Sequence, residues 1–320
     1  MVDAAGVEVL RSPAAGRFLD PRHGAAVAQA VIERLLAGAL TGVAGCEELE
    51  LFGPPPEVLV VRTAPLWDAD GSLIGAMASV ADVTELRGME RVRRDFVANV
   101  SHELKTPIGA LGLLTETFLA CDDPEVARRL ARQLVKEVER LGRIVDDLLD
   151  LSRAESDDRT ARDPARVRDL VGEAVARVET LAAAKRIPVR VGPVDEALAL
   201  VCDADQVVGA LTNLLDNAIS YSAAGQPVEV RADRDGDRVV VTVVDHGIGI
   251  PSRDLERIFE RFYRVDRARS RDTGGTGLGL AIVRHVAQAH GGEVSVESIE
   301  GEGSTFRLVL GATSPSGAAA

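Results

Sequence analysis

Long hydrophobic runs are missing from this sequence. Gln29 and Glu33 interrupt its most apolar early stretch, residues 25–44, whereas a membrane-spanning helix needs roughly 18 or more apolar residues. The N-terminus also shows no signal peptide. We therefore expect no membrane span, and the chain is predicted to be a soluble cytoplasmic protein or the cytoplasmic part of a membrane sensor whose anchor lies outside it.

Cysteine and lysine are scarce. The three cysteines, Cys46, Cys121 and Cys202, are far apart and form no Cys-x-x-Cys pair, which argues against a metal site or a disulfide framework and favours reduced thiols. Arginine supplies nearly all of the positive charge, and the formal net charge is −13. An acidic chain lacks the phosphate-neutralising surface that binds nucleic acid, so we expect no nucleic-acid partner.

The 320 residues, 46% of them hydrophobic, suffice for two or three domains. We predict a multidomain α+β fold with four parts: a small mixed domain (1–84), a helical hairpin (85–156), a two-layer α/β sandwich domain (164–312) and a flexible tail (313–320). Residues 156–164 are polar, end in proline and are typical of a linker.

Hydrophobic periodicity predicts the elements of the first and third parts. In the first part we expect a helix at 25–40 and strands at 7–10, 58–66 and 73–80. In the α/β part we expect helices at 168–186, 203–222 and 280–290, and strands at 187–191, 228–232, 238–245, 293–298 and 304–310. Asp235-Gly236 is typical of a hairpin turn.

The hairpin is predicted from two apolar seams. Residues 97–118 carry apolar side chains at alternating spacings of three and four, and Pro107 is expected to kink this helix. A second helix restarts with Asp123 as N-cap and Pro124 at its first position, and its wider seam covers residues 127–151. A stripe this wide favours dimerisation into a four-helix bundle. Packing against the chain's own C-terminal half is the alternative.

A single histidine lies on the first helix of this hairpin. At 100° per residue, His102 falls roughly 160–170° from the centre of the apolar seam, so its imidazole is expected to point away from the core. Glu103 follows it, and Thr106 shares its face one turn later. A neutral imidazole is nucleophilic, and an adjacent carboxylate can orient the ring or take its proton. A surface histidine on a packed helix is the alternative.

One face of the helix at 203–222 carries two carboxamides and a phenol. Asn213, Asn217 and Tyr221 are spaced four residues apart. An amide oxygen is a hard, uncharged ligand suited to Mg²⁺ that phosphates already hold, so the carboxamides of Asn213 and Asn217 are candidate ligands. A polar surface stripe would look the same in the sequence.

Two glycine-rich segments also suggest nucleotide chemistry. Asp245 ends a strand and is followed by Gly247 and Gly249, which would let a ring approach the backbone beside a carboxylate that accepts from an exocyclic amine. Residues 274–280 open directly into a helix, where free amides and the dipole attract phosphate. The arginine-rich residues 264–273 before them are typical of a mobile lid. A tight strand-to-helix turn is the alternative for the first segment, and a lone glycine run such as the second is weak evidence.

In this order, five segments resemble the motifs of sensor histidine kinases of two-component systems. They are the H box (102–107), the N box (213–221), the first glycine box (245–249), the F box (258–264) and the second glycine box (275–280). Residues 70–75 and 82–85 give the first domain a looser resemblance to PAS sensor domains.

The resemblance implies a fold of PAS-like domain, dimerising helical hairpin and ATP-binding domain, with ATP and Mg²⁺ as cofactors, a homodimer, and a response regulator as partner. His102 would accept phosphate from ATP and pass it to an aspartate of the regulator, Glu103 would take or bind the imidazole proton, and Thr106 would position water in a phosphatase step. The implied nucleotide-binding residues are Asn213, Asn217 (also on Mg²⁺), Tyr221, Asp245, Gly247, Gly249, Gly275, Gly277, Leu278 and Gly279.

Three positions depart from the family pattern. Ser220 stands where a lysine is frequent, Gln206 stands where an arginine is frequent, and His246 is unusual inside the glycine box. Two alternatives to a kinase stay open at this point: a scaffold that binds ATP without transferring phosphate, and an ATPase or serine kinase with a similar nucleotide fold. The cognate regulator and the signal are not readable from the sequence.

Overall fold

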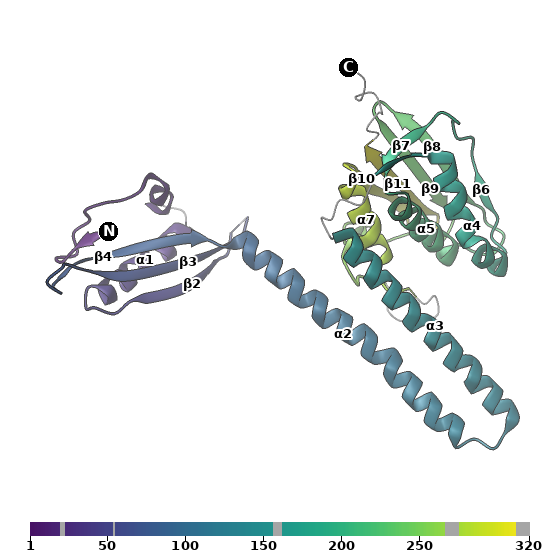
Figure 1. Ribbon diagram of the computed structural model, residues 1–320, viewed down its shortest axis with the longest axis horizontal. Helices are drawn as coiled ribbons and strands as arrows, with labels where there is room; N and C mark the ends of the chain where they lie inside the picture. Colours follow the sequence, from purple (N-terminus) through teal and green to yellow (C-terminus); the bar gives the residue numbers. More distant parts are fainter. Residues whose placement is uncertain (20–22, 54, 156–161, 266–274, 312–320) are drawn as a thin grey trace. The chain divides into compact units, whose positions relative to one another are not determined.

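Figure 1 shows a computed structural model of the chain, which describes residues 1–19, 23–53, 55–155, 162–265 and 275–311. The chain divides into two compact units, Met1–Ala98 and Asn99–Ala320, and the boundary falls within helix α2 (Thr84–Leu119). The predicted mixture of helices and strands is confirmed. In the described part of the chain, no helix is both long and apolar enough to cross a membrane.

The first unit is a four-stranded antiparallel sheet with a helix on one face. The strands are β1 (Val2–Asp3), β2 (Gly45–Leu51), β3 (Glu57–Trp67) and β4 (Leu73–Asp82), in the order β1-β4-β3-β2. A 3-10 helix, η1 (Pro13–Leu19), precedes α1 (His23–Ala39). Alternation along β3 buries Leu59 and Val61, which form a core with Ala28 and Val31 of α1.

The prediction of a strand at 7–10 was wrong. Val7, Val9 and Leu10 are each more than 60% exposed, because this segment folds back on the N-terminus and the Met1 amine donates to the Leu10 carbonyl at 2.8 Å. The short strand β1 takes the sheet edge beside β4 instead. Strand β2 was missed because three of its seven residues are glutamates and Leu49 is its one buried side chain.

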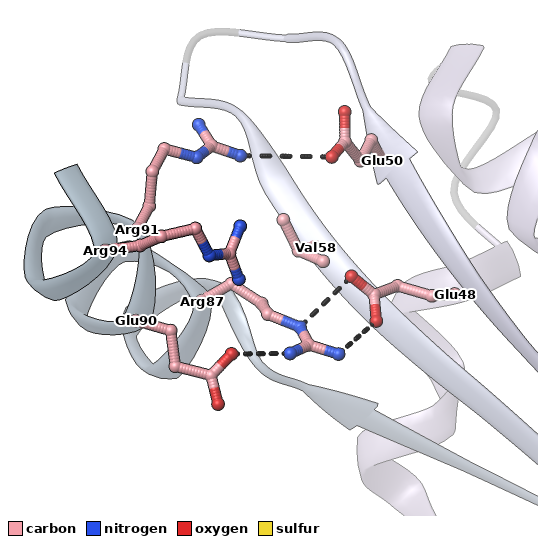
Figure 2. Close-up of a pocket in the computed structure, with 7 residues that line it drawn as sticks. All are labelled: Glu48, Glu50, Val58, Arg87, Glu90, Arg91 and Arg94. Atoms are coloured by element: carbon pink, nitrogen blue, oxygen red, sulfur yellow. Dashed lines mark hydrogen bonds and ion pairs between the residues drawn. The ribbon is translucent and has the colours of Figure 1, made fainter. Parts of the chain in front are cut away.

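The first turns of α2 are tied to the sheet of the same unit. The Val58 amide donates to Thr84 Oγ1 at 2.8 Å, and the Thr84 hydroxyl donates to Asp82. Figure 2 shows Arg87 between Glu48 of β2 and Glu90 of α2, at 2.5 Å from each. These two carboxylates raise the pKa of the Arg87 guanidinium above its usual value. The helix therefore starts at a fixed position on the edge strand.

The hairpin consists of α2 and α3 (Pro124–Glu155), and α2 runs through Pro107 as one helix. The predicted restart is confirmed, since Asp123 accepts from the Glu125 amide at 2.8 Å. In the single chain, large apolar side chains are exposed on both helices, among them Val97, Ile108, Leu113, Val135, Val138 and Leu149.

The C-terminal part of the second unit has two layers. Its five-stranded sheet has the order β10-β11-β9-β8-β6, in which β6 and β8 are parallel and the other pairs antiparallel. Helices α4 (Val167–Lys185), α5 (Ala204–Tyr221) and α7 (Gly279–Ala289) form the second layer (Figure 1). The strands are β6 (Val189–Val191), β8 (Val228–Asp235), β9 (Arg238–Asp245), β10 (Glu293–Ile299) and β11 (Gly303–Gly311).

The elements predicted for this part are confirmed, with bounds that differ by at most three residues. Two strands were missed, β5 (Asp163–Arg166) and β7 (Ala199–Cys202), which pair with each other outside the main sheet. Asp163 and Pro164 therefore belong to a strand and not to the predicted linker. The rest of that linker, most of the predicted lid and the predicted tail lie outside the described residues.

The buried centre of β3 provides a test of the first unit. Replacing Leu59, which is fully buried, by alanine should lower the free energy of unfolding of this unit by about 2–5 kcal/mol because it leaves a cavity. Urea unfolding followed by the fluorescence of Trp67, the one tryptophan of the chain, reports on this unit. The control Arg62→Ala, at an exposed position of the same strand, should change stability by less than about 0.5 kcal/mol. Equal effects of the two variants would contradict the assigned core.

Candidate active site

The imidazole of His102 is presented to solvent. Its side chain is 77% exposed, as its position opposite the apolar seam predicts. The ring Nδ1 lies 4.0 Å from Glu103 Oε1, and the Thr106 hydroxyl donates to the His102 carbonyl at 3.2 Å. A nucleophile placed this way is accessible to a second domain or molecule, with a carboxylate close enough to orient it.

Glu103 is held from the second helix of the hairpin. Arg140 of α3 lies 3.7 Å from the second oxygen of Glu103 and 3.1 Å from Glu137. The Arg140 and Glu103 side chains are only 16% and 26% exposed, so water screens this pair less than a surface pair. The pairing keeps the Glu103 carboxylate beside the histidine and joins α2 to α3 at this level.

Helix α5 presents the predicted polar face. Asn213 and Asn217 are half-buried and Tyr221 is 37% exposed, while Leu214, Leu215 and other apolar residues of α5 fill the core behind them. Asp203 caps the helix by accepting from the Gln206 amide at 3.1 Å. Amphipathicity thus fixes which side of α5 the three polar groups occupy.

Asp245 lies at the end of the central strand β9 and is 6% exposed. Burial raises the pKa of its carboxyl, and the Gly247 amide, which donates to it at 2.9 Å, opposes that shift. Gly249 has a φ of +65°, and a Cβ there would lie 2.0 Å from the Ile299 carbonyl. Only glycine fits this turn, which leaves the buried carboxylate with backbone and no side chain on its flank.

The start of α7 is the second glycine-rich segment. Gly277 has a φ of +76°, and its carbonyl accepts from the Phe262 amide at 2.8 Å. Leu278 is fully buried, whereas Gly275 is exposed with open space around it. The Gly279 Cα faces Asn213, since a Cβ there would lie 3.2 Å from the Asn213 carboxamide oxygen. The helix N-terminus and the amide face of α5 therefore adjoin.

These contacts bring most of the sequence-predicted nucleotide residues together. Asn213 adjoins Gly279, the Tyr221 carbonyl accepts from the Ile248 amide at 3.3 Å, and Asp245 accepts from Gly247. The resulting surface carries a buried carboxylate, a phenol, two carboxamides and a helix N-terminus. Such a donor set fits a purine nucleotide and, at the carboxamides, a Mg²⁺ ion. His102, Glu103 and Thr106 lie on α2 and interact there and with α3.

The structure also accounts for two of the departures from the family pattern. Lys185 of α4 donates to the Ser220 carbonyl at 3.1 Å, so a cation from another helix lies near the position where the sequence lacks one. Burial lowers the pKa of the Lys185 ammonium, and Asp216 opposes that shift. His246 is exposed beside the buried Asp245.

One polar contact of this region was missed from the sequence. The Thr276 hydroxyl, inside the second glycine segment, donates to Asp147 of α3 at 2.5 Å. The available signal was the place of Asp147 within an apolar stripe, three residues after Ile144 and four before Leu151, which are each 1% exposed. A carboxylate in such a stripe needs a hydrogen-bond partner from a neighbouring element.

Two protein families match parts of the chain. The family described as "Histidine kinase-, DNA gyrase B-, and HSP90-like ATPase" matches residues 202–314, which include α5, β9 and α7. The family described as "His Kinase A (phospho-acceptor) domain" matches residues 92–157, which hold His102. An ATP-binding domain thus follows a phospho-acceptor domain on one chain.

Curated relatives are similar over the same region. The sensor-like histidine kinase SenX3 of Mycolicibacterium smegmatis is 45% identical over 237 residues, which cover 73% of this chain and 62% of that protein. The sensor histidine kinase WalK of Bacillus subtilis is 38% identical over 258 residues, which cover 79% of this chain and 42% of that protein. The chain therefore spans less than two thirds of the length of these relatives.

Among solved structures, the histidine kinase ThkA in complex with response regulator protein TrrA matches with a TM-score of 0.56 at 22% identity, covering 90% of this chain and 82% of that chain. This likeness concerns the fold. The two family matches and the named relatives confirm the resemblance found in the sequence, and the chain belongs to the sensor histidine kinases of two-component systems.

Proposed function

We propose that this protein is an ATP-dependent histidine kinase that phosphorylates its own His102 and passes the phosphoryl group to an aspartate of a response regulator. The observation that carries this is the pairing of two features on one chain. His102 is 77% exposed beside a carboxylate, and the groups of an ATP-binding domain adjoin one another at α5 and the start of α7.

The proposed nucleotide site assigns one task to each group. Asp245 would accept from the adenine amino group while Gly247 and Gly249 let the ring lie against the backbone. Tyr221 would lie along the nucleoside, and the amides of Gly275, Gly277, Leu278 and Gly279 would bind phosphate at the α7 N-terminus. Asn213 and Asn217 would face the phosphates, with Asn217 as a Mg²⁺ ligand. The metal supplies neutralisation of phosphate charge when bound.

The transfer step needs positioning more than covalent help from the protein. The unprotonated ring nitrogen of His102 would attack the γ-phosphorus, forming a P–N bond while the bond to the ADP oxygen breaks. Glu103, held by Arg140 at 3.7 Å, would receive or stabilise the proton on the other ring nitrogen, Nδ1, which it approaches to 4.0 Å. Thr106, one turn along the same face, would position water when the regulator is dephosphorylated.

The assembly proposed for this cycle is a homodimer. Val138, Val145 and Leu149 of α3 are each more than 40% exposed, and a second hairpin would cover them in a four-helix bundle. The first unit, whose sheet has the order β1-β4-β3-β2 with α1 on one face, is proposed as a PAS-like sensor. A cytoplasmic location fits these parts.

Labelling separates this proposal from its alternatives. Purified protein incubated with γ-labelled ATP and Mg²⁺ should acquire acid-labile, alkali-stable label, because a phosphoramidate hydrolyses in acid. His102→Gln should lose that label while still binding nucleotide, since His102 lies on α2 outside the nucleotide site. Label that is acid-stable would indicate a serine kinase, and nucleotide binding without label in wild type would indicate a scaffold.

A matched pair of glycine variants tests the nucleotide turn. Gly249→Ala should destabilise the ATP-binding part by at least about 1–3 kcal/mol and weaken nucleotide binding, because φ is +65° and the new Cβ meets the Ile299 carbonyl. Gly275→Ala has no atom within 4 Å of its Cβ and should leave stability unchanged. Thermal unfolding by circular dichroism, with and without Mg²⁺ and ADP, measures both. A wild-type melting profile for Gly249→Ala would contradict the assigned turn.

A further inference from the structure

Helix α3 contacts the start of α7 through a carboxylate. The Thr276 hydroxyl donates to Asp147 Oδ2 at 2.5 Å, and Thr276 Oγ1 in turn accepts from the Leu278 amide at 3.2 Å. The Thr276 side chain thus connects Asp147 to the backbone of the glycine-rich turn. Ile144 and Leu151, on the same stripe of α3, are each 1% exposed, so this contact is partly shielded from water.

The surroundings of Asp147 are unfavourable to negative charge. Burial raises the pKa of its carboxyl to about 6, the carboxylates of Asp150, Asp216 and Asp146 add to that shift, and the hydrogen bond from Thr276 opposes it. The cations of the neighbouring elements act on the other carboxylates. Arg143 of α3 and Lys185 of α4 act on Asp216, and Arg153 of α3 and Arg177 of α4 act on Asp150.

A triphosphate at the start of α7 would add negative charge beside this carboxylate. Thr276 lies between Gly275 and Gly277, whose amides belong to the proposed phosphate site, and Asn213 adjoins Gly279 two residues later. A carboxylate and a phosphate that share a site shielded from water repel each other more strongly than on an open surface. Binding of phosphate is therefore opposed while an ionised Asp147 holds Thr276.

We propose that Asp147 is a positioning residue that couples the helical hairpin to the nucleotide: it holds the glycine-rich turn against α3, and binding of a nucleoside triphosphate releases that turn. The inference rests on the proposed function, because it needs phosphate at the start of α7. The coupling is reciprocal, so whatever weakens the contact strengthens triphosphate binding by the same factor.

The position of Asp147 along α3 gives the release a role. Arg140, which pairs with Glu103 next to His102, lies seven residues before Asp147, or about 10 Å along the helix axis. Transfer needs the reacting atoms within about 3–3.5 Å. While Asp147 holds the glycine-rich turn, that turn is fixed two turns of α3 away from the level of Glu103. Release of the contact lets the glycine-rich turn move.

Nucleotide affinity of the full chain tests this coupling. The affinity for Mg²⁺ with a non-hydrolysable ATP analogue is measured by calorimetry for wild type and Asp147→Asn at pH 8 and pH 5.5. Asparagine still accepts from Thr276 but carries no charge, so it should bind roughly five- to tenfold tighter at pH 8. The difference should shrink at pH 5.5, below the pKa of about 6, where wild-type Asp147 is mostly protonated. Protonation of the analogue affects both proteins equally and cancels in this comparison.

The neighbouring carboxylate provides the control. Asp146 is exposed on the same helix, and Asp146→Asn removes the same charge without touching Thr276, so its affinity should stay within about twofold of wild type. Hydrogen–deuterium exchange adds a second readout. Saturating analogue should raise the exchange of residues 143–151 in wild type, and less so in Asp147→Asn.

The outcomes are distinct. Equal affinities for wild type and Asp147→Asn at both pH values, or unchanged exchange in α3, would overturn the coupling while leaving the nucleotide site intact. An equal gain in Asp146→Asn would also overturn it, because a general charge effect would then suffice. Absence of nucleotide binding by wild type would overturn the proposed function and the coupling together.

Discussion

Close contact between backbones is the constraint on which the ATP-binding part depends. A Cβ at Gly303 would lie 2.1 Å from the Asp245 carbonyl, and one at Gly249 would lie 2.0 Å from the Ile299 carbonyl. The turn after β9 and the turn before β11 can lie together only because neither has a side chain there. Asp245 is buried at this point because Ser304 of β11 pairs with it across the sheet. The Asp245 carboxylate, the proposed adenine acceptor, is therefore positioned by main-chain packing, and its raised pKa follows from the same burial.

Helix α3 contacts both the region of His102 and the proposed phosphate site. Arg140 and Asp147 are seven residues apart and so lie about 20° apart around the helix. The first pairs with Glu103 beside the histidine and the second accepts from Thr276 beside the proposed phosphate site. A rotation or shift of α3 would alter both contacts at once, which gives the hairpin a physical route to influence nucleotide and acceptor together. In the first unit, Arg87 and Glu48 similarly fix where α2 begins (Figure 2).

The sequence predicted those parts of the fold that depend on local periodicity. Helices α4, α5 and α7 and the long strands of the second sheet each span seven residues or more and carry an apolar face, so their period is readable. Strands β5 and β7 have four residues each and pair only with one another, which is too short for a period. The segment at 7–10 has the composition of a strand but forms only an isolated bridge, between Glu8 and Val2, because Val2 and Asp3 occupy the edge of β4. Pairing is a tertiary event that local composition does not encode.

In the candidate site, too, features set by local geometry were predictable and a long-range contact was not. Exposure of His102 and the shared face of Asn213 and Tyr221 follow from helix geometry, whereas the contact between Asp147 and Thr276 joins residues 129 positions apart. Its strength matters for the proposed cycle. A hydrogen bond to a charged group contributes about 1.5–3 kcal/mol, enough to shift a two-state equilibrium by roughly 10- to 150-fold. A contact of that size favours the docked form yet leaves it reversible. The proposed cycle first brings ATP to His102 and then exposes the phosphohistidine to a regulator. Such a cycle needs a docking contact in this range, because a stronger one would hold the nucleotide away from the histidine and a weaker one would not be sensitive to nucleotide.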